Sequence, residues 1–257
     1  MDERVEIEKI VEVEKEREGR RKKEDKEGEG ELETKSIKAV KERKDKGKVK
    51  ITERDLRLIR FIAEQYAIDL KQLCQLNKAI EDTEIGESTA RRIVDRWQRA
   101  GFVESQKIFV KDPVYVWVTR KGLDLVGYDF LKATVPSEAT LRHLVAITNM
   151  RLKLEEGKKA QFKSERLIRS EAVRVKKGKE LPHVPDGEVS MNGVVYPIEI
   201  ELSVKKLTRI EGIMRELLGR YPTIYYYVVK ETKTGVQHAL EKLPENLRGR
   251  VKINDLL

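Results

Sequence analysis

Residues 183–206 read HVPDGEVSMNGVVYPIEIELSVKK, and this stretch decides the fold that the sequence predicts. Asn192-Gly193 lies between two runs that alternate in polarity, which is a strong signal for a two-residue hairpin turn. With that turn in place, counting back along the two strands sets Asp186 opposite Glu199. The stretch therefore predicts a hairpin at the centre of a sheet.

Side chains alternate between the two faces of a strand, so the hairpin has one acidic face and one apolar face. The acidic face carries Asp186, Glu188, Ser190, Val195, Pro197, Glu199 and Glu201. The apolar face carries Val189, Met191, Val194, Tyr196, Ile198, Ile200 and Leu202. Four carboxylates with no lysine among them repel one another. We expect a divalent cation, a raised pKa or an adjacent lysine to offset this repulsion; a solvated polar face is the alternative.

Composition limits the class of protein. The 257 residues suffice for one or two domains, and 39% of them are charged, with a net charge of +9 and a pI near 9.4. A basic chain favours polyanionic partners, and nucleic acid first among them. Cys74 is the single cysteine and lies in an apolar pattern, which indicates a small core residue and a reducing, cytoplasmic setting. No apolar run approaches membrane-spanning length, so no membrane is expected as a partner.

Residues 1–50 have the composition of a charged, disordered tail. They hold 17 basic and 16 acidic residues, so they contribute only +1 of the net charge. The positive charge is therefore expected on residues 51–257. The tail is interpreted as a solvated segment or as a docking segment for a partner protein.

Residues 51–132 contain three helix patterns, a hairpin and a closing helix, which is the order of a winged helix-turn-helix. The residues expected to cap the four helices are Thr52, Asp69, Ser88 and Thr119, and the second helix is predicted over 70–76. In such modules the third helix enters the major groove of double-stranded DNA and the wing contacts the backbone.

The candidates for DNA contacts are basic residues of the third helix and of the wing: Arg91, Arg92, Arg96, Arg99, Lys107 and Lys111. Arginine suits guanine and phosphate, whereas lysine on a wing suits phosphate. A winged helix that serves protein contacts, with solvated arginines, is the alternative.

Residues 137–257 predict a mixed sheet with helices on both faces, which gives an α/β (α+β) fold class. The expected order is a long helix from Ser137 to Gly157, a strand-like segment over 162–173, the central hairpin, a helix over 206–220, a strand over 223–230, a helix after Gly235 and a strand over 251–255. Helices on both faces shield the acidic face from water.

The acidic residues also resemble a known motif. Pro185-Asp186, followed after twelve residues by Glu199-Ile200-Glu201, resembles the PD-(D/E)XK nuclease superfamily. The resemblance implies a restriction-endonuclease-like fold in which Asp186 and Glu199 bind Mg²⁺ or Mn²⁺. Glu201 stands where the family has its lysine, so Lys205, or else Lys206, is the candidate for that role.

The candidate catalytic set is therefore Asp186, Glu199, Glu201 and Lys205, with the three carboxylates as metal ligands. Glu165 and Glu138 are candidates for a further carboxylate at the site, although each is expected more often to be a surface residue.

A wider resemblance covers residues from about 52 to 245. The winged-helix pattern followed by HVPDGEV and YPIEIELSVKK is similar to the replication-relaxation family of plasmids and integrative elements, which is related to relaxases of the mobilisation C class. It implies origin recognition, strand-specific DNA nicking, and replication or mobilisation proteins as partners of the tail. A non-catalytic origin-binding or transcription-regulatory protein with a degenerate nuclease fold is the alternative.

Other chemistries find no support in the sequence. His143, His183 and His238 are far apart and form no His-x-His pair, which excludes the histidine-cluster mechanism of the commoner relaxases. His183 is interpreted as a rim or turn residue. The tyrosines at 225–227 are interpreted as core strand residues, with a nucleophilic tyrosine as the less favoured alternative. No phosphate-binding glycine loop is present in the sequence, which argues against an NTPase.

Overall fold

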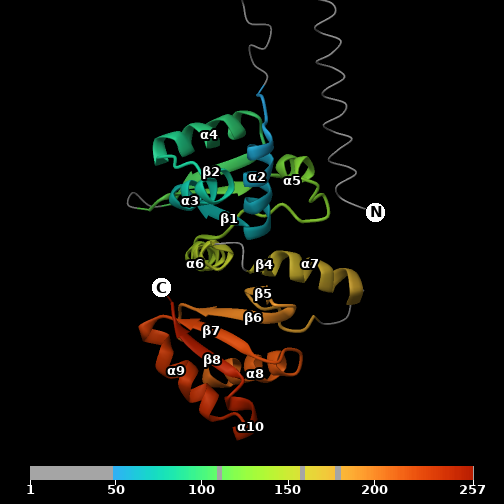
Figure 1. Ribbon diagram of the computed structural model, residues 1–257, viewed down its shortest axis with the longest axis vertical. Helices are drawn as coiled ribbons and strands as arrows, with labels where there is room; N and C mark the ends of the chain where they lie inside the picture. The colour runs from blue at the N-terminus through green and yellow to red at the C-terminus, as the bar shows by residue number, and fades with distance from the viewer. Residues whose placement is uncertain (1–48, 109–111, 157–159, 177–180, 257) are drawn as a thin grey trace, which may run out of the picture. The chain divides into compact units, whose positions relative to one another are not determined.

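The structure, a computed structural model, describes residues 49–108, 112–156, 160–176 and 181–256 (Figure 1). Over these ranges the chain has mixed α and β content, with nine helices and two sheets, one of them a five-stranded mixed sheet. The predicted α+β class is therefore confirmed. Nearly all of the predicted tail, and also Lys111, lie outside the described residues.

The first sheet and its helices come from the N-terminal part of the described chain. The elements are α2 (Glu53–Gln65), β1 (Ala67–Asp69), α3 (Leu70–Glu81), α4 (Glu87–Arg99), β2 (Val103–Lys107), β3 (Val114–Val118) and α5 (Arg120–Leu125). The strand order is β1-β3-β2 with antiparallel pairs. The three helices, the hairpin and the closing helix follow in the predicted order, and β1 is an additional strand. The order fits the winged helix-turn-helix, which stays a prediction.

The ends of these helices test the predicted caps. Thr52 and Asp69 each form a capping box, and Thr119 accepts from the backbone N–H of Gly122 at the start of α5. The prediction for Ser88 is wrong, because the N-cap of α4 is Gly86, two residues earlier, and no side chain caps the helix. Helix α3 also continues to Glu81, beyond the predicted end at residue 76.

The second sheet comes from the C-terminal part of the described chain. The elements are α6 (Glu138–Glu155), β4 (Gln161–Ser164), α7 (Glu165–Lys176), β5 (Gly187–Met191), β6 (Val194–Glu201), α8 (Leu207–Leu218), β7 (Ile224–Val228), α9 (Lys230–Glu241), α10 (Glu245–Arg248) and β8 (Val251–Asp255). The strand order is β4-β5-β6-β7-β8. The pairs among β4, β5 and β6 are antiparallel, and β6, β7 and β8 are parallel.

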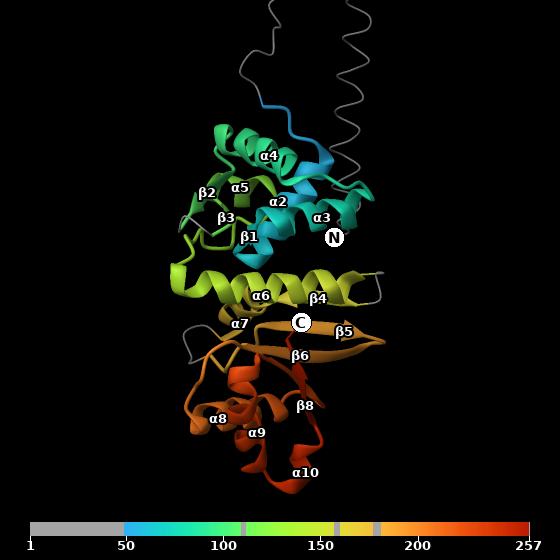
Figure 2. The same ribbon diagram turned by 90° about the vertical axis from the view of Figure 1, so that its left-hand side faces the viewer.

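Helices cover both faces of the five-stranded sheet (Figures 1 and 2). Ile147 and Met150 of α6 pack with Val189, Ile198 and Ile200 of the central hairpin. On the opposite face, apolar residues of α8 and α9 pack with β7; they are Ile210, Met214, Leu217, Val236 and Ala239. Val189, Ile198 and Ile200 of the apolar hairpin face are thus core, as predicted, whereas Val194 beside the turn is 39% exposed. The acidic face is directed towards the layer of α8 and α9.

Helix α6 also contacts the first sheet (Figure 2). Leu141 clusters with Ala67, Tyr115 and Trp117 of that sheet. Gln72 of α3 donates from Nε2 to the Val145 carbonyl, 2.8 Å away. Helix α6 therefore packs against apolar residues of both sheets.

Two predicted elements of this part are wrong. The segment 162–173 is a strand only as far as Ser164 and then becomes helix α7, because the Ser164 hydroxyl accepts from the Leu167 backbone N–H and caps a helix there. Gly235 does not precede α9 but lies inside it, where a Cβ would meet nothing within 4 Å. The helix tolerates glycine at the usual modest cost.

Candidate functional site

The central hairpin forms as predicted and positions three carboxylates. Asn192 and Gly193 have φ values of 51° and 77°, as a two-residue turn of type I′ requires, and β5 pairs with β6 in the predicted register. Glu199 and Glu201 lie on β6, and Asp186 directly precedes β5. We refer to Asp186, Glu199 and Glu201 as the carboxylate cluster.

Asp186 is held at the cluster by backbone contacts. Its Oδ2 accepts a hydrogen bond from the Ile200 backbone N–H at 2.7 Å, and its carbonyl oxygen accepts from the Glu165 N–H at 3.3 Å. The next residue must be glycine, since a Cβ at Gly187 would lie 2.1 Å from Cζ of Phe162. The Asp-Gly pair of the motif therefore has a structural reason that is separate from its chemistry.

The carboxylate cluster is enclosed. Glu199 is 6% exposed and Glu201 is 4% exposed. The alternative of a solvated polar face is therefore wrong for these two residues. Charged side chains that are this deeply buried need close partners of opposite charge.

Each carboxylate of the cluster has its own basic partner. His143 Nε2 lies 2.9 Å from Asp186 Oδ1, and His183 Nε2 lies 2.8 Å from Glu199 Oε1. Lys205 Nζ lies 2.7 Å from Glu201 Oε2. An adjacent lysine was one of the expected means of offsetting the repulsion among the carboxylates. The two histidines also offset this repulsion.

Burial and neighbouring charges shift the pKa values in the cluster. Burial, together with the charge of Asp186, raises the pKa of Glu199 to about 7, against the hydrogen bond from His183. Burial also acts to lower the pKa of His183, but the hydrogen bond and charge of Glu199 outweigh it and raise that pKa. The same balance with Asp186 raises the pKa of His143. The Glu199–His183 pair therefore holds a proton near neutral pH.

The histidines are the part of the site that the sequence does not reveal. His183 is more than a rim residue: its backbone N–H donates to Glu216 Oε1 at 2.5 Å, and its carbonyl accepts from Arg220. Both partners lie at the C-terminal end of the α8 region and fix the loop before β5. The only sign of the His183–Glu199 contact in the sequence is that His183 lies shortly before the Pro185-Asp186-Gly187 segment.

The geometry also tests the divalent ion that the resemblance implies. Among the described residues, no three His, Cys, Asp or Glu side chains converge closely enough to hold a metal ion. Each carboxylate of the cluster instead lies against its own basic partner. The donor set does not fit Mg²⁺ or Mn²⁺ in this arrangement, so we assign no step to a metal ion.

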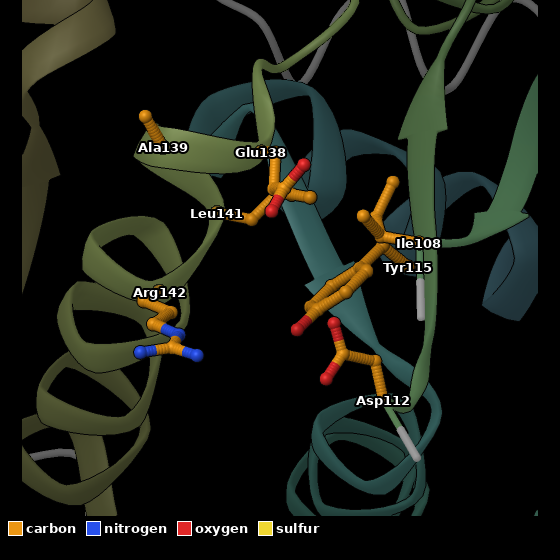
Figure 3. Close-up of a pocket in the computed structure, with 7 residues that line it drawn as sticks. All are labelled: Ile108, Asp112, Tyr115, Glu138, Ala139, Leu141 and Arg142. Atoms are coloured by element: carbon orange, nitrogen blue, oxygen red, sulfur yellow. The ribbon is translucent and has the colours of Figure 1, made fainter. Parts of the chain in front are cut away.

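Neither of the two further candidate carboxylates joins the cluster. Glu165 is the first residue of α7, and its Oε1 accepts from Arg169 at 2.5 Å. Glu138 lines a separate pocket of about 350 Å³ at the start of α6, with Asp112, Tyr115 and Arg142 (Figure 3). The predictions for these two residues as additional site ligands have no support in their contacts.

The tyrosines at 225–227 lie on β7, as predicted for core strand residues. Tyr226 is directed towards the layer of α8 and α9 and packs in its core, whereas Tyr227 packs with the cluster around α6 on the opposite face. Burial, with the charges of Glu199, Glu201 and Asp186, raises the pKa of Tyr226 well above its usual value. A phenol held neutral in this way is poorly suited to act as a nucleophile.

A second group of candidate residues lies on α4. Arg91, Arg92 and Arg99 are exposed, and within the described part of the chain no acidic side chain pairs with any of them. Arg96 differs, because its Nη2 lies 2.5 Å from Oδ1 of the buried Asp55. Three of the four predicted arginines are therefore available to a partner, while Arg96 is engaged in the fold.

The predicted wing contributes one described lysine. Lys107 is exposed at the end of β2. Lys111 lies outside the described residues, so its predicted contact stays untested. Cys74 is half-buried against the core of the first sheet, in keeping with its predicted role.

Comparison of the chain with models of known families, with curated proteins and with solved structures found no match. None of the described helices is long and apolar enough to cross a bilayer. The proposals that follow therefore rest on the residues and contacts of this chain.

Proposed function

We propose that this chain binds double-stranded DNA through α4, with Arg91, Arg92 and Arg99 contacting phosphates or guanines. The observation that carries the proposal is the absence, within the described residues, of any acidic partner for these three exposed arginines. Some other exposed arginines pair with a neighbouring carboxylate, as Arg215 does with Glu211 at 2.8 Å, whereas α4 carries three exposed arginines that do not. Exposed guanidinium groups without an acidic partner on one helix suit the phosphate backbone and the major groove.

The wing extends the same surface. Lys107 on β2 is exposed and close in sequence to the hairpin turn, where a backbone contact is expected in winged-helix proteins. Arg96 supports this surface indirectly, because its bond to Asp55 fixes α4 against α2. Binding energy is expected mainly from charge, with sequence preference added by groove contacts.

The experiment compares duplex binding by the native chain and by the triple variant Arg91→Gln, Arg92→Gln, Arg99→Gln. Fluorescence anisotropy with a labelled duplex at low salt measures the affinity. We expect a loss of at least tenfold, whereas the matched control Arg215→Gln on α8 keeps native affinity. Equal affinities of the triple variant and the native chain refute the proposal.

Strand cleavage at the carboxylate cluster is a second candidate function, favoured by the Lys205 amine 2.7 Å from Glu201 at the carboxyl end of β6. Hydrolysis of a phosphodiester needs a base that takes the proton of the attacking water and a cation near the charge that develops on phosphate. Glu199, with a pKa of about 7, is the candidate base. Lys205 is the candidate cation. Together with the resemblance described above, these groups suggest nicking at the origin of a plasmid or other mobile element.

Supercoiled plasmid tests this second function. We expect the native chain to convert it to open circles, with Mg²⁺ or Mn²⁺ added and omitted in parallel samples. Asp186→Asn and Glu199→Gln should abolish nicking, and Glu211→Gln should not. Lys205→Met against Lys206→Met decides which of the two lysines serves the site. If the native chain fails to nick in every condition, the non-catalytic DNA-binding protein is the better account.

A further inference from the structure

Tyr226 has a feature that core packing does not explain. Its ring is 2% exposed and packs with Met214, Leu217 and Val236 of the adjacent helices. Its hydroxyl is buried and has no hydrogen-bond partner among the described residues. Its neighbours on the same face of β7, Ile224 and Val228, are aliphatic. Tyr226 thus places a polar hydroxyl on a strand face that is otherwise aliphatic.

The hydroxyl lies beside the carboxylate cluster. Tyr226 is the registered partner of Glu199 across the parallel pair β6–β7, so the two side chains leave the sheet on the same face. The charges of Glu199, Glu201 and Asp186 all act on the phenol. Because they disfavour the phenolate, the hydroxyl keeps its proton and remains a hydrogen-bond donor.

A buried donor without an acceptor destabilises the folded state. Phenylalanine would fill the same space without that cost. The orphan hydroxyl therefore needs an acceptor that enters the site. The acceptor should be small, because Tyr226 is 2% exposed and its hydroxyl is buried. Water meets the requirement: it accepts from the phenol and donates both of its own protons to carboxylates.

We propose that Tyr226 positions a water molecule against Glu199 and Glu201, and that this water is the nucleophile of the site. The inference rests on the second candidate function, strand cleavage. Glu199 takes a proton from the water while the water oxygen forms a bond to phosphorus. The phosphorus–oxygen bond to the leaving nucleotide breaks, and the leaving oxygen takes up a proton from bulk water. Tyr226 keeps its own proton throughout and only orients the water.

The test combines a high-resolution crystal structure of the intact chain with kinetics of Tyr226→Phe. We expect an ordered water within hydrogen-bond distance of Tyr226 Oη and a carboxylate of the cluster. In Tyr226→Phe the water should be lost or displaced, and kcat for plasmid nicking should fall roughly 10- to 100-fold with KM unchanged. Tyr227→Phe, on the opposite face of the same strand, is the matched control and should behave as the native chain.

The outcomes separate the two proposals. A hydroxyl that is dry, or bonded directly to a carboxylate, overturns the inference whether or not the native chain nicks DNA. Native kcat in Tyr226→Phe also overturns it, even if the water is present. An ordered water in a native chain that does not nick supports the water site and its dependence on Tyr226, but it overturns both strand cleavage and the role of this water as a nucleophile.

Discussion

Arg96 on α4 donates from Nη2 to Oδ1 of Asp55 on α2, and the two atoms lie 2.5 Å apart. Asp55 is fully buried and also accepts from the backbone N–H and the hydroxyl of Thr52, both at 2.9 Å. The Asp55 carboxylate thus bonds to the N-cap residue of α2 and also holds the last turn of α4. Arg96 therefore positions the helix that carries the DNA-contact candidates.

Replacing Arg96 should cost stability. In Arg96→Ala the buried Asp55 loses the closer of its two cationic partners, since Arg54 lies 3.8 Å away, and we expect a decrease of about 1.5–3 kcal/mol in the free energy of unfolding. Arg92→Ala, at an exposed position of the same helix, should change it by less than about 0.5 kcal/mol. Urea denaturation followed by circular dichroism measures both. Equal effects of the two substitutions would mean that the Arg96–Asp55 contact has no structural role.

The hairpin turn makes a second prediction. Gly193 has a φ of 77°, where an alanine costs roughly 1–2 kcal/mol. Gly212 lies within α8, and a Cβ there meets nothing within 4 Å, so Gly212→Ala should stabilise by up to about 1 kcal/mol. The two substitutions are the same in chemistry and opposite in sign. Thermal unfolding of both variants checks this, and two shifts of the same sign would contradict the turn geometry.

Gly187 links the hairpin to β4. In Gly187→Ala the new Cβ would meet Phe162 Cζ at 2.1 Å, and we expect a loss of about 1–3 kcal/mol from overpacking. A second substitution, Phe162→Leu, removes the atoms that clash and should recover part of the loss. A double-mutant cycle of unfolding free energies measures the recovery. Additive effects at 187 and 162 would show that the strands are not packed in this way.

The carboxylate cluster predicts how stability depends on pH. Glu199 titrates at about 7 in the folded chain and near its usual 4.5 when unfolded, so the folded state binds more protons between these values. Stability should therefore fall as pH rises from about 4.5 to about 7. The raised pKa values of His143 and His183 act in the same direction as the pH passes above 6.5.

Glu199→Gln should flatten the decline between pH 4.5 and 7, because the amide does not titrate. Urea midpoints of the native chain, Glu199→Gln and the control Glu211→Gln at a series of pH values measure it. Parallel curves for the native chain and Glu199→Gln would show that the pKa of Glu199 is not raised.

The local rules of the sequence predict much of the fold. Asn192-Gly193 and the alternation on either side are sufficient for the register of β5 and β6, because turn type and periodicity both act over a few residues. The same locality explains the caps at Thr52 and Asp69. The segment 162–173 fails for a related reason: a four-residue strand runs directly into a helix, and the short polar–apolar pattern does not mark the change at Ser164.

Local sequence rules do not predict which residues from distant elements contact the site residues. His143 meets Asp186 across 43 positions, and Arg96 meets Asp55 across 41, so only the packing of α6 and α4 brings these pairs together. Sequence spacing identifies the carboxylates because they share one hairpin. It also identifies Lys205, four positions after Glu201, but not His143 and His183, which lie outside the two strands of the hairpin.

The measurement that tests the central claim most directly is the salt dependence of duplex binding. Each phosphate contact contributes about 0.9 to the slope of log K against log salt concentration, so removing Arg91, Arg92 and Arg99 should reduce the slope by roughly 2.7 if all three contact phosphates. The account predicts a reduced slope for the triple glutamine variant and a native slope for Arg215→Gln. An unchanged slope in the triple variant would contradict binding of DNA through α4.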